Sequence, residues 1–261
     1  MGDRARDPTL MPVLLTGRRG GTTHRSVELL ASLPVELRLI GGLSVMCRVG
    51  SPHRATVDLD AVARVDPEVH ADLTRLALIA PGGGQYRFEG QLELDVIDVA
   101  PGDASDVLAE LGAPPAELTD LELNLVAHTW AHDTATALDL VAIDDATGER
   151  LAEAPGRLVA TAAGIAAMKA TTVPLRASSK PEKRASDLYD LGRLIETGAL
   201  TAEGLRSMPG PVREAVTERI RGWFVDDRGR DRTYRDVRRF DDPLLDLDHI
   251  AYLVDRIAES V

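Results

Sequence analysis

The spacing of the hydrophobic residues changes along the chain, and this change most constrains the fold. Segments near the start alternate apolar and polar residues, which is the pattern of a strand with one buried face. From residue 162 onward, apolar residues recur every three or four positions, as they do along one side of a helix. We therefore expect an α/β (α+β) fold: a mixed sheet flanked by helices in residues 1–115, followed by a mostly helical lobe in residues 116–261. A cleft is expected between the two lobes.

Helix and strand signals give the expected order of elements. Pro34 ends the first helix, and Pro114-Pro115 interrupts the chain before the helical lobe. The expected strands are 35–40, 56–62, 86–89, 91–99 and 138–143. The expected helices are 23–33, 43–49, 67–79, 104–111, 117–132, 162–173, 183–196, 201–208, 211–224 and 243–259.

Charge and cysteine content exclude several classes of protein. The 261 residues carry a formal net charge of −12, which argues against a protein that coats nucleic acid generally. Cys47 is the only cysteine, so the chain forms no internal disulfide and no cysteine-based zinc site. The N-terminus lacks the apolar region of a secretory signal, and the longest nearly apolar run, 158–168, is shorter than a membrane span. We expect a cytoplasmic protein with no membrane partner.

A glycine pair follows the second predicted element. The strand 35–40 runs directly into Gly41-Gly42, and a short helix that contains Ser44 comes next. Backbone N–H groups at such a turn approach a phosphate closely, because no Cβ intervenes and because the N-terminus of a helix attracts anions. The turn is therefore a candidate phosphate site.

Two aspartates follow on the next predicted strand. Asp58 and Asp60 are two positions apart, so both carboxylates leave the same face of the strand. Such a pair suits Mg²⁺, which binds one or two carboxylates together with phosphate oxygens. The strand 91–99 offers a third acid on one face, either Glu93 or Asp95. Asp98 is an odd number of positions away from both and therefore lies on the opposite face.

The order of these features resembles the nucleotidyltransferase superfamily, whose minimal motif is a Gly-Gly or Gly-Ser turn, a pair of acids and a third acid. The second half narrows the resemblance, because Lys169 lies on one predicted helix and the next carries a basic residue followed by Asp187-Leu-Tyr-Asp190-Leu. This arrangement is similar to the AbiEii-type toxin branch, which includes the nucleotidyltransferase toxins of type IV toxin–antitoxin systems. The resemblance covers residues 35–195. It implies a nucleotidyltransferase-type sheet.

The resemblance implies Mg²⁺-dependent transfer of a nucleoside monophosphate from an NTP to an acceptor hydroxyl, with release of pyrophosphate. Asp58, Asp60 and Asp95 are then expected to hold two Mg²⁺ ions, with Mn²⁺ as an alternative, and Asp95 also to help activate the nucleophile. Lys169 is expected to neutralise the β- and γ-phosphates, and Asp187 to position Lys169 or contact the nucleotide. The expected nucleotide contacts are Gly41, Gly42, Ser44, Thr56 and Lys169.

The lysine distribution supports a site at these helices. Only three of the 30 basic residues are lysines, and Lys169, Lys180 and Lys183 all fall within one short stretch. Lysine provides a compact, mobile point charge, whereas arginine provides a planar fork, so the two are not freely exchanged at a phosphate.

The family resemblance implies that the acceptor is the 3′ end of tRNA, that the protein is a toxin that blocks translation, and that a cognate antitoxin is a partner. Two segments of net charge +3, 176–184 and 221–240, are candidate RNA contacts. The second interleaves arginines with Trp223, Phe224, Tyr234 and Phe240, which either stack on bases or pack into the core of a salt-bridged helix.

Two alternatives remain open from the sequence. Nucleotidyl transfer to a protein or small-molecule hydroxyl uses the same residues with a different acceptor. A non-catalytic module that binds a nucleotide or a partner is disfavoured because Asp58, Asp60 and Lys169 are all present. His128 and His132 have the spacing of a zinc helix, but Thr129 replaces the glutamate that a zinc protease requires.

Overall fold

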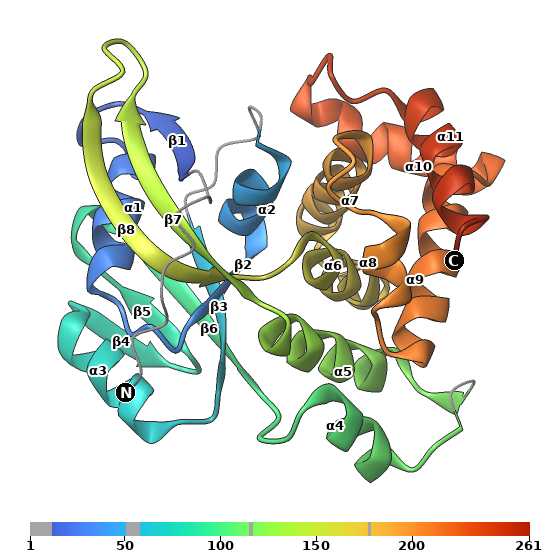
Figure 1. Ribbon diagram of the computed structural model, residues 1–261, viewed down its shortest axis with the longest axis horizontal. Coiled ribbons are helices and arrows are strands. Elements are labelled where there is room, and N and C mark those ends of the chain that lie inside the picture. Colours follow the sequence, from blue (N-terminus) through green and yellow to red (C-terminus); the bar gives the residue numbers. More distant parts are fainter. Residues whose placement is uncertain (1–11, 51–57, 115–116, 177–178) are drawn as a thin grey trace.

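The computed structural model describes residues 12–50, 58–114, 117–176 and 179–261. Within these ranges the chain forms one mixed sheet with helices on both faces and a bundle of helices beside it (Figure 1). The strands are β1 (Val13–Gly17), β2 (Arg38–Ile40), β3 (Asp58–Arg64), β4 (Ile79–Gly82), β5 (Gln85–Arg87), β6 (Glu93–Val99), β7 (Thr136–Asp144) and β8 (Arg150–Val159). The helices of the first half are α1 (Thr22–Ser32), α2 (Gly41–Val49), α3 (Pro67–Leu76), α4 (Ala104–Leu111) and α5 (Asp120–Asp133). The helices that follow are α6 (Ala162–Arg176), α7 (Pro181–Glu196), α8 (Ala202–Arg206), α9 (Gly210–Phe224), α10 (Asp227–Val237) and α11 (Leu247–Ala258). No helix in the described ranges is long and apolar enough to cross a membrane.

The strand order is β1-β7-β8-β2-β3-β6-β5-β4. The pairs β1/β7, β2/β8 and β3/β6 are parallel, and the other neighbouring pairs are antiparallel. The predicted mixed sheet flanked by helices is therefore confirmed. Strands β7 and β8 follow residue 115 but lie between β1 and β2, so the sheet uses residues from both sides of the predicted lobe boundary. The division into lobes at residue 115 stays a prediction.

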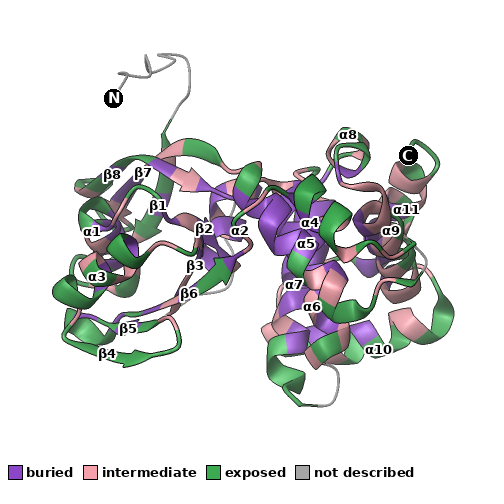
Figure 2. Ribbon diagram, turned by 90° about the horizontal axis from the view of Figure 1, so that it is seen from below, coloured by how far each residue is buried: buried purple, intermediate pink, exposed green. Residues whose placement is uncertain are grey.

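The sheet separates two hydrophobic cores, and alternation along β3 decides which residues face which core. Leu59, Ala61 and Ala63 pack with α1 and α3 on one face. Val62 packs on the other face, in the core that α5, α6, α7, α9 and α11 share. Asp58 and Asp60 lie four and two positions before Val62, on the same face of β3, and therefore face the helical side of the sheet. Figure 2 shows the buried residues concentrated where the sheet meets α5, α6 and α7.

Helix α6 is buried along almost its whole length and is built largely from small residues. A Cβ at Gly164 would lie 3.1 Å from Ala131 Cα, so glycine permits close packing of α6 on α5. The helix continues through Pro174 to Arg176, although the sequence predicts that it ends at 173. Pro174 has no N–H to donate to the carbonyl of Ala170. Arg219 Nη1 of α9 donates to that oxygen instead, at 3.1 Å.

Several elements differ from the sequence prediction. β1, β4, β8 and α10 are not predicted. Most residues of α10 are charged, so it contains too few apolar residues for a hydrophobic pattern to reveal it. Helix α2 begins at Gly41 rather than at residue 43, and α11 begins at Leu247 rather than at residue 243, because the Asp246 side chain accepts hydrogen bonds at its N-cap.

Candidate active site

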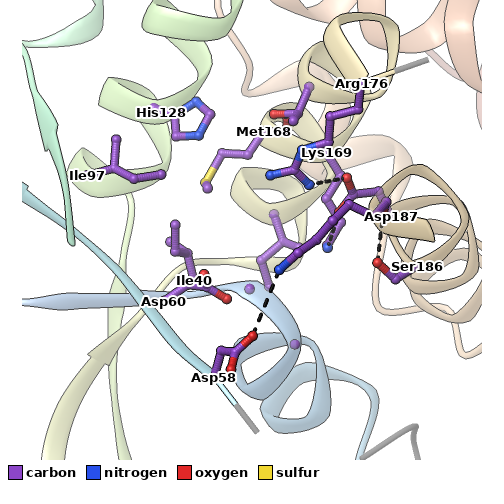
Figure 3. Close-up of a pocket in the computed structure, with 15 residues that line it drawn as sticks. Ile40, Asp58, Asp60, Ile97, His128, Met168, Lys169, Arg176, Ser186 and Asp187 are labelled. Atoms are coloured by element: carbon purple, nitrogen blue, oxygen red, sulfur yellow. Dashed lines mark hydrogen bonds and ion pairs between the residues drawn. The ribbon is translucent and has the colours of Figure 1, made fainter. Parts of the chain in front are cut away.

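A pocket lies between the sheet and the helical bundle (Figure 3). On the sheet side it is lined by the glycine turn at the start of α2 and by the acidic end of β3. On the helical side α6 and α7 contribute basic and acidic side chains, and α5 contributes His128. The pocket thus brings together residues that are far apart in the sequence, and most of the predicted site residues line it.

Gly41 and Gly42 both line the pocket, as predicted. Gly41 has φ +71°, a conformation that side chains with a Cβ rarely adopt. A Cβ there would lie 2.0 Å from Asp60 Oδ2, so the turn and the carboxylate fit together only because position 41 is glycine. The first N–H groups of α2 begin at this turn and lack partners within the helix.

Ser44 does not reach the pocket. Its side chain is fully buried, and its Oγ donates a hydrogen bond of 2.7 Å to the carbonyl oxygen of Gly41. The hydroxyl therefore holds the turn, and the structure does not present it to a phosphate. Thr56, another predicted nucleotide contact, lies outside the described residues.

The register of β3 and β6 places the acidic residues. The two strands are parallel, with Asp58 opposite Glu93 and Asp60 opposite Asp95. Both predicted third acids therefore share the face of the aspartate pair. Glu93 forms an exposed ion pair with Arg87, at 3.1 Å, whereas Asp95 interacts electrostatically with Asp60. Asp98 has the other parity, as predicted, and lies 2.8 Å from His70 Nε2.

Asp60 is the carboxylate most altered by its surroundings. Burial raises the pKa of Asp60 to about 6, and the negative charges of Asp95 and Asp58 act in the same direction. The ammonium groups of Lys169 and Lys183 oppose this rise but do not overcome it. Near neutral pH the carboxylate of Asp60 is ionised, which is the form that binds a metal.

Lys169 lies in the interior between two carboxylates of α7. Its Nζ donates to Asp187 Oδ1 at 2.9 Å and lies 2.7 Å from Asp190 Oδ2. Arg176 Nη1 donates to the second oxygen of Asp187 at 2.5 Å. Burial lowers the pKa of Lys169, but the attraction of Asp187 and Asp190 outweighs it and the net pKa is raised. Lys169 is therefore protonated and held in place at the pocket wall.

Three residues of the pocket cluster are missing from the sequence-based site. Asp190 is fully buried and shares a helix face with Asp187, three positions earlier. Arg176 reaches Asp187 from the end of α6, and Lys183 Nζ lies 3.8 Å from Asp58 Oδ2. The Asp-Leu-Tyr-Asp spacing is the signal that points to Asp190. The lysine cluster contains Lys183 and the basic segment 176–184 contains Arg176, but their contacts with Asp58 and Asp187 depend on tertiary packing.

His128 and His132 do not form a metal pair. His128 lines the pocket, and its Nδ1 contacts the carbonyl oxygen of Asn124 at 2.8 Å. Burial lowers the pKa of His128, so the ring is neutral near pH 7. His132 Nδ1 instead lies 3.2 Å from Asp133 Oδ1.

The pocket carboxylates suit Mg²⁺ chemically, but they do not enclose an ion by themselves. Among the described residues, no three Asp, Glu, His or Cys side chains converge closely enough to hold a metal. Mg²⁺ commonly takes only one or two protein carboxylates and completes its coordination with phosphate oxygens and water. Asp58 and Asp60 fit that mode, in which the nucleotide supplies ligands that the protein lacks.

The candidate RNA segment 221–240 presents little aromatic surface. Phe224 is fully buried, Trp223 packs against the core, and Phe240 lies on Tyr189 with ring centroids 4.5 Å apart. Tyr234 is 58% exposed. Arginines of this segment form ion pairs with acids of α11, such as Arg221 with Asp255. The structure thus favours the core-packing alternative for three of the four aromatic residues.

A comparison with protein families identifies the chain. Residues 29–258 match the model of the nucleotidyl transferase AbiEii toxin family of type IV toxin–antitoxin systems. The chain belongs to this family. The match supports a nucleotidyltransferase and extends through the helical region beyond residue 195, where the sequence resemblance ends. No curated protein and no solved structure matches the chain.

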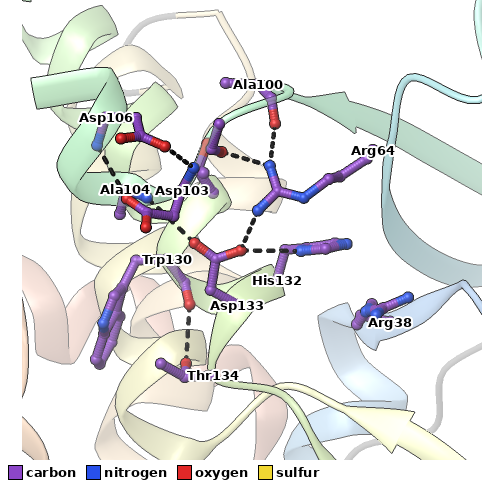
Figure 4. Close-up of polar contacts among 12 residues, drawn as sticks. Arg38, Arg64, Ala100, Asp103, Ala104, Asp106, Trp130, His132, Asp133 and Thr134 are labelled. Carbon is purple, nitrogen blue, oxygen red and sulfur yellow. Dashed lines mark hydrogen bonds and ion pairs between the residues drawn. The ribbon is translucent and has the colours of Figure 1, made fainter.

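The strand that carries the aspartate pair is anchored at its other end (Figure 4). Arg64, the last residue of β3, donates to the carbonyl oxygens of Ala100 and Gly102 and, at 2.5 Å, to Asp133 Oδ1. The other oxygen of Asp133 accepts from the backbone N–H of Ala104, at 3.1 Å. The network ties β3 to α4 and to the end of α5, which also carries His128.

We expect Asp133→Ala to lower the free energy of unfolding by about 2 kcal/mol, because it removes a charge-assisted partner of Arg64 and a backbone N–H acceptor. Urea denaturation measures the change. Glu153→Ala serves as the control: Arg150 and Glu153 form an ion pair in which both side chains are more than half exposed, so its loss should cost less than about 0.5 kcal/mol. Equal losses in the two variants would contradict the prediction.

A second prediction concerns pH. The folded chain binds the Asp60 proton more tightly than the unfolded chain, because the folded pKa is about 6 and the usual value is about 3.9. The contribution of Asp60 to stability is therefore greatest below pH 4 and is lost as the pH rises toward 6. Asp60→Asn removes this dependence, so the variant should gain stability relative to the wild type between pH 4 and 6.

Urea denaturation of both proteins across that pH interval, in EDTA, tests this prediction. Titrating groups that do not interact with Asp60 are common to the two proteins and cancel in the difference. A difference that stays constant across the interval would show that the carboxyl group of Asp60 is not shifted.

Proposed function

We propose that the protein transfers a nucleoside monophosphate from an NTP to the 3′-terminal hydroxyl of tRNA, using Mg²⁺ and releasing pyrophosphate. The observation that carries the proposal is a carboxylate pair on one strand facing a buried lysine from the helical bundle, with a glycine turn beside both. Blocking the tRNA 3′ end stops translation, which is the toxin role, and a cognate antitoxin is the expected partner within the family.

Different pocket residues are proposed to act on different parts of the triphosphate. Asp58 and Asp60 are positioned to hold Mg²⁺, which neutralises phosphate charge and lowers the pKa of the acceptor hydroxyl when bound. The N-terminus of α2 at Gly41-Gly42 offers backbone N–H groups to phosphate oxygens. Lys169 is a fixed positive charge for the β- and γ-phosphates.

The reaction exchanges one P–O bond for another. The acceptor oxygen forms a bond to the α-phosphorus, and the bond from that phosphorus to the bridging oxygen breaks. Pyrophosphate leaves with that oxygen, and its growing negative charge is stabilised by Lys169. The hydroxyl proton passes to a carboxylate, for which Asp95 is the candidate because it lies opposite Asp60 in the sheet.

The acidic groups on α7 have a positioning role in this proposal. Asp187 and Asp190 keep Lys169 charged and fix its Nζ, and Arg176 balances part of the negative charge of Asp187. An Asp187→Asn exchange would therefore alter the lysine rather than remove a group that contacts the acceptor.

We expect Asp58→Asn to reduce transfer about 100-fold or more with little effect on folding, because this side chain is half exposed. Lys169→Met should also abolish transfer, but it removes an ammonium that two buried carboxylates share and is expected to destabilise the fold. Asp58→Asn is therefore the cleaner test. Purified wild type and variant are incubated with Mg²⁺, each α-³²P-labelled NTP in turn, total tRNA and total protein.

Label at the tRNA 3′ end with wild type, and its loss with Asp58→Asn, is the expected result. Label in protein or in a small molecule would replace tRNA with another acceptor while keeping the transfer chemistry. Absence of label in every fraction, with nucleotide still bound, would favour a non-catalytic binding module. Full transfer by Asp58→Asn would remove Asp58 from the site.

A further inference from the structure

Lys183 is a second cation at the carboxylates, and its setting differs from that of Lys169. Its Nζ lies 3.8 Å from Asp58 Oδ2, so the ion pair joins the first turn of α7 to the start of β3. The side chains of Lys183 and Asp58 are 53% and 47% exposed. Lys169 is only 8% exposed and lies within 3 Å of two carboxylates. Of the two lysines of the pocket, Lys169 is therefore fixed and Lys183 is held loosely.

The loose pair costs little to separate. An ion pair with both partners half exposed contributes at most about 1 kcal/mol, because water screens it and ordering a long side chain opposes it. Lysine also carries its charge on a flexible four-carbon stem, so its Nζ can move several ångströms without any movement of the helix. Moving Lys169 would instead take its charge away from Asp187 and Asp190, which are both buried.

Lys183 and a divalent metal are attracted to the same group. Both are cations, both are drawn to Asp58, and each repels the other at this distance. Lys183 also acts electrostatically on Asp60, the second carboxylate of the pair. A bound polyphosphate reverses the balance, because its oxygens attract the ammonium away from the carboxylates.

We propose that Lys183 couples metal binding to nucleotide binding: its ammonium opposes a metal that arrives alone and moves from Asp58 to a phosphate oxygen when metal and NTP arrive together. The inference rests on the proposed use of a divalent metal and an NTP. It adds selection for the metal–nucleotide complex over the free ion. Because the ammonium repels the free metal but contacts the phosphate of the metal–nucleotide complex, removing it has opposite effects on the affinities for the two forms of the metal.

The test measures binding rather than transfer. Free Mn²⁺ gives an EPR signal that disappears on binding, so titrations report its affinity for the protein without and with the four α,β-methylene NTP analogues. Lys183→Met is compared with the wild type. Lys180→Met is the matched control, because Lys180 lies three residues earlier at the N-cap of α7, does not line the pocket, and removes the same charge.

We expect Lys183→Met to bind Mn²⁺ alone about threefold or more tightly than wild type, since a repelling charge is removed. The same variant should bind Mn²⁺ with the preferred analogue about threefold or more weakly, since a phosphate contact is lost. Lys180→Met should change neither affinity by as much. The opposite signs distinguish coupling from a purely structural role, which weakens both affinities.

Two outcomes would overturn the inference: both affinities of Lys183→Met weakened, or the affinity for Mn²⁺ alone unchanged. If none of the four analogues binds the wild type, the nucleotide part of the proposed function fails instead. The titration with Mn²⁺ alone still decides the competition at Asp58 in that case, because tighter binding upholds it and unchanged binding contradicts it.

Discussion

Lys169 lies in the protein interior, where an ammonium is stable only because Asp187 and Asp190 surround it. This charged group joins α6 to α7 and fixes a positive charge at the pocket wall, toward the aspartate pair of β3. Much of the surrounding structure serves this contact. The small residues of α6 let it approach α5, and the carbonyl left without a donor by Pro174 is satisfied from α9. The polar centre and the apolar bundle around it therefore depend on each other.

The sheet supplies the opposing half through register and parity. Because β3 and β6 are parallel and in register, four acidic side chains occupy one face in two adjacent rows. Gly41 keeps the neighbouring turn free of a Cβ that would collide with Asp60. Arg64, at the other end of β3, fixes the strand to α4 and α5. The positions of the two halves of the pocket thus follow from backbone pairing and from a buried charge network.

Local signals predicted those parts of the structure that local interactions determine. Helix α4 occurs as predicted, 104–111, because Asp103 and Asp106 form a capping box that is readable in the sequence. The alternation of side chains along a strand correctly predicted that Asp95 and Asp98 lie on opposite faces of the sheet. Helix α10 was not predicted because most of its residues are charged and few are apolar. Strands β1 and β8 were not predicted because each pairs with a strand that is far away in the sequence. The contact of Lys183 with Asp58 and the burial of Ser44 depend on tertiary packing, which residue spacing does not encode.

The insertion of β7 and β8 between β1 and β2 has a consequence for synthesis. Val13 pairs with Leu140, and Arg38 pairs with Leu158. Strands β1 and β2 therefore cannot form these pairs until residues more than 100 positions later have been synthesised. Lys169 and Asp187 follow later still, on α6 and α7. A chain emerging from the ribosome, or one cut before α6, carries the aspartate pair without Lys169 and Lys183. The pocket is therefore complete only once most of the chain has been synthesised.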